Sequence, residues 1–321
     1  MSKSVSLVTG AAGFIGSHLS ARLLAEGDEV HVFLRPTSSL ARLSTVADNL
    51  VIHRLDLSDK AAVQEHVAAI LPDRVFHLAA ETRLSTELSC TNAREAIGLY
   101  VDPAVNLVEA LAHVPDPPSV VIRAGTIAEY GRVALPYSEA GRASPLTPYG
   151  MGMLAATNCL GMLAPALPFP VITARLALCY GPRQSCQFLV PALIDAVLSQ
   201  HPITVERPDD RRDLLYVSDA VTALMRIAES APNDCTIVNV SSGMAPTMRE
   251  VARRIVDLAD CDPALVSMRR PLPGERPVEL RCAAELARVR FGWERQVGLE
   301  EGLRQTIAAE QRMRSMAGSA R

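Results

Sequence analysis

Residues 5–16 read Val5-Ser-Leu-Val-Thr-Gly10-Ala-Ala-Gly13-Phe14-Ile15-Gly16, and this stretch decides the fold of the 321-residue chain. A short apolar strand, Val5–Thr9, runs into glycines spaced G-x-x-G-x-x-G, and a helical pattern follows over Ser17–Glu26. Glu29–Leu34 has the pattern of a second strand. Such a βαβ unit sets backbone N–H groups and a helix N-terminus against a phosphate. It predicts a dinucleotide site, although a glycine triplet can also be an ordinary structural turn.

Strands and helices then alternate along the chain. We expect a strand at Leu50–Arg54, a helix at Lys60–Ile70, a strand at Arg74–Leu78, a helix at Pro103–His113, a strand at Ser119–Arg123, a helix at Tyr149–Leu163 and a strand at Val171–Leu178. This alternation is typical of an α/β protein with a Rossmann-type, doubly wound parallel sheet. We expect this domain to span residues 1–180, with about 213–241 returning to it. A smaller C-terminal substrate-binding domain would use about 181–212 and 242–310, and 311–321 would be a frayed tail.

Composition excludes several classes of protein. Hydrophobic residues make up 49% of the chain and charged residues 21%, and the net charge is −3, so neither nucleic acid nor an anionic membrane is an expected partner. The seven cysteines have no paired spacing, which argues against a zinc site or a disulfide framework. The N-terminus enters a strand at once, and no apolar run approaches the ~20 residues that span a bilayer. We expect a cytoplasmic protein with a small-molecule substrate and no metal.

The end of the second strand bears on the choice of cofactor. NAD sites usually carry a carboxylate there, which bonds the ribose 2′-hydroxyl. This chain has instead Arg35, followed by the hydroxyl residues Ser38 and Ser39. A guanidinium with neighbouring hydroxyls suits a 2′-phosphate, so we expect NADPH/NADP+ rather than NADH. The alternative is a solvated arginine at a strand end.

More motifs follow in a fixed order. They are Asp56-Leu57, His77-Leu-Ala79-Ala80, Thr126 four residues before Tyr130-Gly131, Tyr149, Tyr180-Gly-Pro-Arg183, Arg212-Asp213-Leu-Leu-Tyr-Val217, Phe291-Gly-Trp293 and Leu299-Glu-Glu-Gly302. Together with the glycine loop they resemble the extended short-chain dehydrogenase/reductases, the group of nucleotide-sugar epimerases and dehydratases. The resemblance covers about residues 4–305.

The resemblance implies a role for each motif. The cofactor would lie on Gly10, Gly13, Phe14, Ile15 and Gly16 at its phosphates, on Asp56 and Leu57 at its adenine, and on Ala79, Ala80 and Tyr149 at its ribose and nicotinamide. Thr126 and Tyr149 would be the catalytic residues.

Several positions depart from the family pattern. The lysine four residues after the tyrosine is Met153, and the serine before it is Gly152. The family's asparagine on the fourth helix falls at Tyr100, and the asparagine that helps to hold a diphosphate falls at Leu178. We expect Tyr100, Met153 and Leu178 to line the substrate pocket. Asp102 and Pro103 resemble an N-cap and a first helical residue, so this helix should start late.

The missing lysine changes the expected chemistry. In the family, the lysine holds the nicotinamide ribose and lowers the tyrosine pKa; the chain's only lysines, Lys3 and Lys60, are poorly placed to replace it. Tyr149 should therefore remain a neutral phenol, which is a poor general base but can still donate a hydrogen bond. Carbonyl reduction suffers least from this loss. A substrate whose carbonyl is hydrogen-bonded to its own phenol or enol would supply the proton itself.

Three functions are compatible with these features. The first is reduction of an aromatic polyketide ketone of the angucyclinone type in antibiotic biosynthesis, as in the ketoreductases that the chain resembles. The second is a nucleotide-sugar 4-ketoreductase or epimerase-like enzyme, in which Arg212 would meet a diphosphate; an ion pair with a neighbour such as Asp213 is the other interpretation of Arg212. The third is a non-catalytic NADP-binding regulator. The chain could be a monomer or a homodimer, and Arg132–Thr147 and Gln184–Phe188 are candidate lid loops.

Overall fold

The computed structural model describes residues 3–82, 84–230 and 236–319. The strands are β1 (Val5–Thr9), β2 (Glu29–Leu34), β3 (Val51–Arg54), β4 (Arg74–His77), β5 (Val120–Thr126), β6 (Val171–Leu176), β7 (Leu178–Tyr180), β8 (Ile203–Val205), β9 (Arg211–Arg212), β10 (Leu214–Tyr216), β11 (Thr236–Val240), β12 (Val266–Met268) and β13 (Glu279–Leu280). Seven of them form one parallel sheet in the order β11-β6-β5-β4-β1-β2-β3. The predicted doubly wound α/β fold is confirmed.

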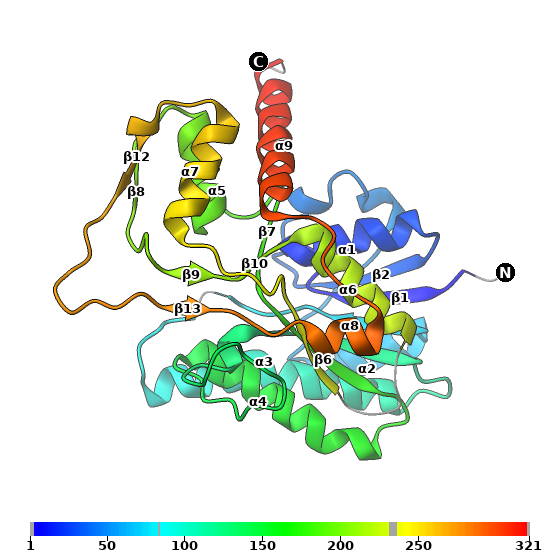
Figure 1. The fold of residues 1–321 in the computed structure, drawn as a ribbon. Helices are drawn as coiled ribbons and strands as arrows, with labels where there is room; N and C mark the ends of the chain where they lie inside the picture. Colours follow the sequence, from blue (N-terminus) through cyan, green and yellow to red (C-terminus); the bar gives the residue numbers. More distant parts are fainter. Residues whose placement is uncertain (1–2, 83, 231–235, 320–321) are drawn as a thin grey trace.

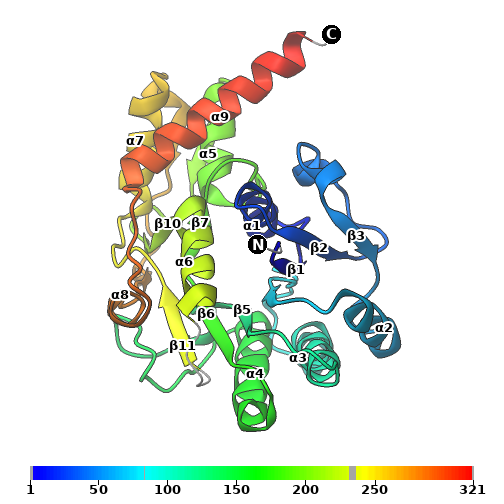
Figure 2. The ribbon, with the colours of Figure 1, turned by 90° about the vertical axis from the view of Figure 1, so that its right-hand side faces the viewer.

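Helices cover both faces of this sheet. The helices of the described residues are α1 (Phe14–Ala25), α2 (Lys60–Ile70), α3 (Cys90–Ala112), α4 (Pro148–Leu163), α5 (Leu189–Leu198), α6 (Val217–Ser230), α7 (Met248–Ala259), α8 (Glu285–Phe291) and α9 (Leu299–Ser319). Short 3-10 turns are η1 (Ala41–Leu43), η2 (Ala47–Asn49), η3 (Ile127–Glu129), η4 (Ala164–Ala166) and η5 (Pro263–Leu265). One face carries α1 and α6, and the other carries α2, α3 and α4 (Figures 1 and 2). The apolar residues of β1, β4, β5 and β6 are buried between these layers.

The first helix begins three residues before the predicted start. It opens at Phe14, directly after Gly13, because the glycine loop turns tightly at Gly10, whose φ is +72°. Glycine adopts that left-handed conformation without strain. The turn therefore delivers the start of α1 to the carboxyl end of β1, where parallel sheets bind their ligands.

The helix that we expected to start late, at Asp102-Pro103, starts earlier in the structure, so that prediction is wrong. The helix α3 begins at Cys90, with Ser89 as its N-cap, and continues through Pro103. Proline inside a helix costs roughly 3 kcal/mol because it removes one hydrogen bond and crowds the preceding turn. Here the preceding turns are buried: Ala96 and Tyr100 pack against α4. That tertiary packing offsets the local signal for a helix start at Asp102-Pro103.

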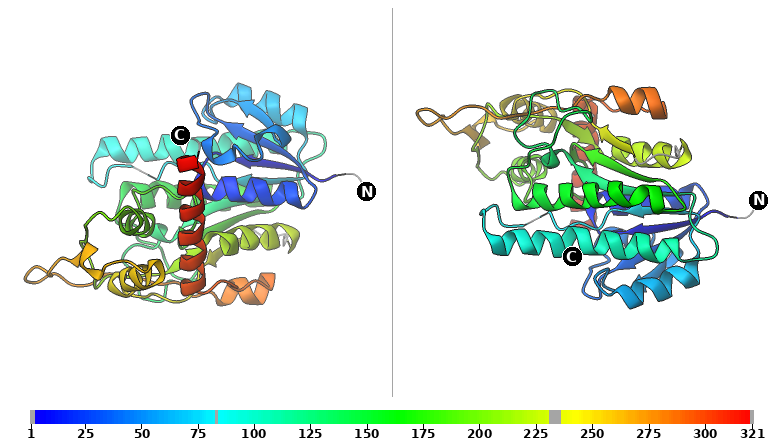
Figure 3. Two further views of the ribbon diagram at one scale, coloured as in Figure 1. Left: turned by 90° about the horizontal axis from the view of Figure 1, so that it is seen from above. Right: turned by 90° about the horizontal axis from the view of Figure 1, so that it is seen from below.

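The C-terminal part of the chain forms a smaller lobe around α5 and α7, with α9 packed against both (Figure 3). Short parallel pairs β8–β12 and β9–β13 edge this lobe, and β7–β10 joins it to the main sheet. The segment α6–β11 returns to the main sheet, where β11 pairs with β6. The predicted frayed tail is wrong for residues 311–319, because α9 continues to Ser319 and Arg314 bonds Asp195 at 2.5 Å.

Candidate active site

One large cavity runs from the glycine loop to the C-terminal lobe. Its volume is about 1050 Å³, and its walls come from β1–α1, β4, β5, α4, β7 and the lobe strands. Of the residues that we expected at the site, those lining it are Gly10, Gly13, Phe14, Ile15, Gly16, Ala80, Thr126, Tyr149, Met153 and Leu178. The cavity is therefore long enough to join the predicted phosphate loop to the predicted catalytic pair.

The glycine loop has the shape of a phosphate cradle. A Cβ placed on Gly10 would lie 2.7 Å from the backbone of Ala79, and one on Gly16 would lie 2.3 Å from the carbonyl oxygen of Gly10. Only glycine permits this close approach of loop, strand and helix. Gly13 caps α1 without a side-chain hydrogen bond, so the first N–H groups of the helix face the cavity end. The residues present fit the pyrophosphate of a dinucleotide.

The remaining predicted cofactor residues lie beside this cradle, outside the cavity walls. Arg35, Ser38 and Ser39 follow β2 on an exposed loop, which Arg54 holds by donating to the carbonyl oxygens of Arg35, Pro36 and Ser38. The Asp56 carboxylate accepts from the backbone N–H and the hydroxyl of Ser58, which lowers its pKa. Leu57 is buried, and Ala79 donates its N–H to Thr9 Oγ1 at 3.2 Å.

The predicted catalytic pair meets at the centre of the cavity. Thr126 ends β5 and caps the 3-10 turn η3, accepting from Ala128 N at 3.2 Å. Tyr149 lies in the first turn of α4, which Thr147 caps. The adjacent Gly150 lets α4 approach η3 closely, because a Cβ there would lie 2.5 Å from the carbonyl oxygen of Ala128. The absence of a side chain at this position brings Tyr149 to Thr126.

Tyr149 is held as a neutral phenol. Burial is the main cause, and it raises the pKa of Tyr149 above its usual value. A hydrogen bond with Thr126 and the charge of Arg123 act in the opposite direction, and the carboxylate of Glu129 adds to the rise. The result agrees with the expectation that Tyr149 donates a hydrogen bond rather than accepting a proton.

Met153 and Tyr100 form one packed unit behind the phenol. Met153 is 2% exposed and contacts the cavity, whereas Tyr100 is not among the lining residues that the structure describes. Tyr100 stacks edge-to-face on Tyr149, with ring centroids 5.8 Å apart, and donates its hydroxyl to the carbonyl of Glu81. A Cβ on Gly152 would lie 2.5 Å from the Tyr100 ring. The two differences from the family pattern, Tyr100 and Gly152, therefore depend on each other, because the ring of Tyr100 occupies the space that a side chain at position 152 would need.

A buried charged cluster lies next to Met153. Arg123, in the middle of β5, donates to Thr157 Oγ1 at 2.9 Å and to the carbonyl oxygen of Met153 at 3.1 Å. Glu129 pairs with Arg175 at 2.8 Å and also accepts from Thr157 at 2.9 Å. Sequence reasoning missed this cluster, although an arginine inside the apolar run Val120-Val-Ile-Arg123 was a visible signal.

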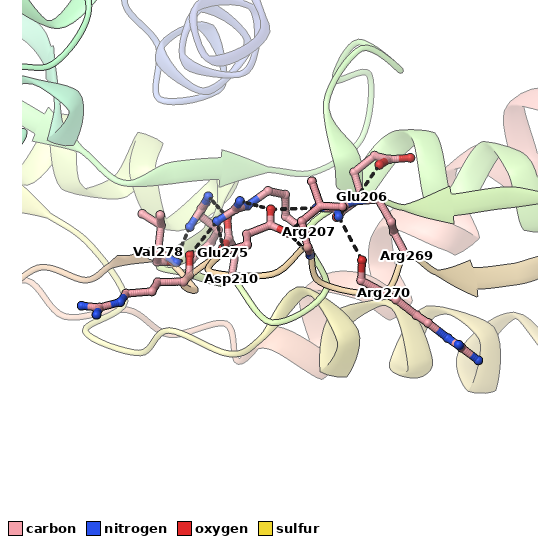
Figure 4. A network of polar contacts seen from close by, with 10 residues as sticks. Glu206, Arg207, Asp210, Arg269, Arg270, Glu275 and Val278 are labelled. Atoms are coloured by element: carbon pink, nitrogen blue, oxygen red, sulfur yellow. Dashed lines mark hydrogen bonds and ion pairs between the residues drawn. The ribbon is translucent and has the colours of Figure 1, made fainter.

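A second charged cluster borders the other end of the cavity. Arg207 bonds both oxygens of Asp210, at 2.9 and 3.0 Å, and also pairs with Glu275 (Figure 4). Arg212 bonds Asp210 at 2.6 Å. The predicted ion pair of Arg212 therefore exists, but its partner is Asp210. Asp213 instead accepts from the backbone N–H and the hydroxyl of Ser242. Along the extended strand β9 successive side chains point to opposite sides, so Asp210 and Arg212 share a side that Asp213 does not.

Only one of the two candidate lid loops reaches the cavity. Gln184, Ser185 and Phe188 line it, whereas no residue of 132–147 is among the lining residues described. Gln184 donates to the carbonyl of Cys179 at 2.8 Å, and its own carbonyl oxygen is buried without a partner among the described residues. Arg42 also lines the cavity and bonds the backbone of Arg183 at 2.9 Å.

Two further observations concern other kinds of site. Among residues 3–82, 84–230 and 236–319, no helix combines the length and hydrophobicity needed to cross a membrane. Within the same residues, no group of three or more His, Cys, Asp or Glu side chains is placed to hold a metal ion. Lys60 pairs with Glu109 at 2.7 Å, on the surface next to α3.

Comparisons with known proteins place the chain in a family. The model of the family described as GDP-mannose 4,6 dehydratase matches residues 7–306. The UDP-glucose 4-epimerase of Mycolicibacterium smegmatis is 31% identical over 94% of this chain and 96% of its own. The GDP-6-deoxy-D-mannose reductase of Pseudomonas aeruginosa is 27% identical over 94% of this chain and 95% of its own.

A solved structure agrees with these sequence matches. The Thermus thermophilus UDP-glucose 4-epimerase, in complex with NAD, is 27% identical, covers 96% of this chain and 99% of its own, and superposes with a TM-score of 0.81. The likeness extends over both the sheet and the C-terminal lobe. The chain therefore belongs to the GDP-mannose 4,6 dehydratase family of extended short-chain dehydrogenase/reductases.

Proposed function

We propose that this protein is an NADPH-dependent ketoreductase that reduces one carbonyl of a flat polycyclic ketone, an aromatic polyketide of the angucyclinone type, in antibiotic biosynthesis. One observation carries the proposal: the arginines beside the substrate end of the cavity are already neutralised by carboxylates. Asp210 takes bonds from both Arg207 and Arg212 and is 4% exposed. A substrate diphosphate needs uncompensated positive charge, which this arrangement withholds.

The walls of the cavity suit an uncharged polycycle. Leu178 stands where the family has a diphosphate-holding asparagine, and it lines the cavity with Met153 and Phe188. Leucine, methionine and phenylalanine offer no hydrogen bond to a sugar or phosphate, but they cover a flat ring system well. On this wall the side-chain carbonyl oxygen of Gln184 is buried without a hydrogen-bond partner among the described residues, so it can accept from a hydroxyl of the substrate.

Reduction is the direction that the site favours. NADPH supplies a hydride to the carbonyl carbon when bound. Tyr149 is a neutral phenol, because burial raises its pKa, so it donates a hydrogen bond to the carbonyl oxygen that gains electron density. Thr126 holds the phenol in place. A phenol or enol next to the carbonyl supplies the proton from the substrate, which replaces the acid catalysis that the family's lysine supports.

The choice of NADPH rests on the end of β2. Arg35 is 64% exposed and lies 3.9 Å from the carboxylate of Glu81, in a loose ion pair open to solvent. Arg54 donates to the backbone carbonyl oxygens of Arg35, Pro36 and Ser38. This leaves a shaped loop with a guanidinium and the hydroxyls of Ser38 and Ser39 at the place of the 2′-group. The loop suits a 2′-phosphate better than a ribose hydroxyl.

The experiment is NADPH consumption by the purified protein against a mixed panel of carbonyl compounds. Half the panel would be angucyclinone-type quinones with a phenol beside the carbonyl, and half would be nucleotide 4-keto sugars. We expect turnover of the quinones alone. Turnover of the sugars would overturn the proposed substrate, and NADPH binding without any turnover would favour a non-catalytic regulator.

A nucleotide-sugar 4-ketoreductase or epimerase-like enzyme is the second candidate. It is favoured by the relatives, which are named as a UDP-glucose 4-epimerase and a GDP-6-deoxy-D-mannose reductase. It predicts that UDP, GDP or dTDP binds in the C-terminal lobe. Calorimetric titration with the three diphosphates separates the candidates, since the neutralised arginines predict no binding at millimolar concentration.

A further inference from the structure

The positive charge that Met153 cannot provide lies directly behind it, on Arg123. The Arg123 guanidinium donates to the carbonyl oxygen of Met153 at 3.1 Å and touches its sulfur at 3.5 Å. The side chain of Met153 therefore separates this guanidinium from the cavity. Arg123 is 2% exposed, so no water competes for the guanidinium and its field reaches the active site with little screening.

The cluster around Arg123 carries an excess of one positive charge. Arg123 and Arg175 share a single carboxylate, Glu129, which bonds Arg175 directly and reaches Arg123 only through Thr157. The nearby His77 is neutral, because burial lowers its pKa to about 3. Glu129 thus bonds Arg175 directly and acts on Arg123 only at longer range, so among the described residues two guanidiniums share one carboxylate.

We infer that Arg123 is a positioning residue that acts on Tyr149 through Met153, in place of the family's active-site lysine. The inference rests on the proposed function only in taking Tyr149 as the hydrogen-bond donor to the substrate. Because Arg123 cannot reach the cavity, it does not hold the cofactor ribose. It performs the electrostatic half of the lysine's role: its charge favours the partial negative charge on the phenolic oxygen while Tyr149 donates its hydrogen bond to the carbonyl oxygen.

The groups that face Tyr149 are few. Tyr100 packs on it from α3, Thr126 and Glu129 face it from the end of β5 and η3, and Arg123 faces it from β5. Glu129 opposes ionisation of the Tyr149 phenol, and Thr126 favours it. Arg123 is the one cation among these groups and lowers the pKa of Tyr149, so replacing Arg123 by a neutral residue should raise that pKa.

The test replaces Tyr149 with 3,5-difluorotyrosine, whose phenol ionises near neutral pH, and follows its pKa by fluorine NMR. We expect Arg123→Met to raise this pKa by about one unit or more, as loss of a nearby cation does. Arg123→Lys should raise it much less. The matched control is Thr157→Val, which breaks the hydrogen bond to Arg123 but leaves its charge, and which should lower stability while barely moving the pKa.

A second experiment moves the charge to the family's position. Arg123→Met alone should lower kcat with little change in KM, and adding Met153→Lys should restore kcat. Met153→Lys in the presence of Arg123 should be poorly tolerated, since it sets two cations side by side. Circular dichroism and NADPH affinity verify that each variant is folded.

An unchanged probe pKa in folded Arg123→Met protein would overturn the inference, as would a double variant no faster than Arg123→Met. The fluorine titration needs no substrate, so its result does not depend on whether the proposed polyketide substrate is correct. A pKa rise without turnover of any quinone would keep Arg123 in this role and reject the proposed substrate.

Discussion

Two arginine–carboxylate clusters flank the same cavity, and they differ in how their charges balance. Near the lobe, three carboxylates (Asp210, Glu275 and Glu206) neutralise three arginines (Arg207, Arg212 and Arg269) through direct bonds. Beneath Tyr149, a single carboxylate serves Arg123 and Arg175. The first cluster removes positive charge from the place where a diphosphate would bind. By the function that we propose, the second keeps positive charge near the phenol that meets the substrate carbonyl.

The two clusters bear on different properties of the protein: the cluster near the lobe on which substrate is bound, and the cluster beneath Tyr149 on how the reaction is catalysed. Relatives of the chain are named for nucleotide sugars, yet here the arginines of the lobe are internally satisfied. The catalytic end has lost its lysine but retains a buried cation one layer deeper. Of the four predictions below, three test these two ends of the cavity and the last tests the loop after β2; they begin with the largest expected effect.

Breaking the neutral cluster should cost the most. Asp210→Asn leaves Arg207 and Arg212 without their shared carboxylate, and removing one member of a buried ion pair costs roughly 3 kcal/mol. Urea unfolding measures this loss. The same variant should acquire UDP binding, detectable by calorimetry. Asp209→Asn is the matched control, since that side chain is 41% exposed and its change should cost less than about 1 kcal/mol.

The catalytic end should tolerate loss of its phenol. Tyr149→Phe should lower kcat roughly a hundredfold, towards the low end of the range for general acid catalysis, because the substrate carries its own proton donor. Steady-state kinetics with a phenol-bearing quinone measures this. A quinone that lacks the adjacent phenol should suffer more from the same substitution. A loss greater than about a thousandfold with the phenol-bearing quinone would contradict substrate-assisted protonation.

Adding a proton to the positive cluster should destabilise the fold. His77 pairs in register with Arg123 on the neighbouring strand, and its folded-state pKa of about 3 lies below the unfolded value of 6.5. The unfolded chain therefore gains a proton that the folded one refuses. Stability is complete above about pH 6.5 and falls by roughly 1.4 kcal/mol per unit as the pH decreases towards 3.

Comparison of His77→Gln with the unsubstituted protein isolates this effect. Glutamine can keep the bond that Thr9 makes with the His77 ring at 2.8 Å, but it cannot be protonated. Between pH 7 and pH 5 the unfolding free energy of the unsubstituted protein should fall relative to that of His77→Gln, because only the histidine protein loses stability at this site. Parallel profiles would show that position 77 does not titrate as expected.

The smallest effect concerns an arginine that belongs to neither cluster. Arg35 is exposed, so its guanidinium can meet a phosphate without breaking a buried ion pair. Arg35→Ser should raise KM for NADPH about tenfold relative to NADH, which corresponds to one charge-assisted contact of about 1.4 kcal/mol. Arg22→Ser, on the surface of α1, is the control and should leave both KM values unchanged.

Sequence patterns predicted most of the fold because each strand, turn and helix depends mainly on residues next to it in the chain. The glycines after Val5–Thr9 and the alternation that follows required no knowledge of distant residues. The third helix shows the limit of this reasoning. Asp102-Pro103 resembled a helix start, but the burial of Ala96 and Tyr100 against α4 extends α3 back to Cys90.

At the candidate site, too, some features follow from the sequence and others only from the packing of distant segments. The chemistry of Thr126 and Tyr149, and the lack of a lysine beside them, can be read directly from residue types and spacing. Tyr100 was expected on the cavity wall, yet it packs behind Tyr149 because Gly152 leaves room for its ring. No spacing rule predicts that exchange between two helices.

The sequence by itself therefore determined the sheet, the glycine loop and the phenol that lines the cavity, since each depends on residues close together in the chain. Only the tertiary structure decided which charges are paired. Asp210 rather than Asp213 bonds Arg212, and Arg123 lies behind Met153 across some 30 positions of sequence. The physical reason is that the energy of a charge depends on its burial and its neighbours, and both are set by how distant segments pack.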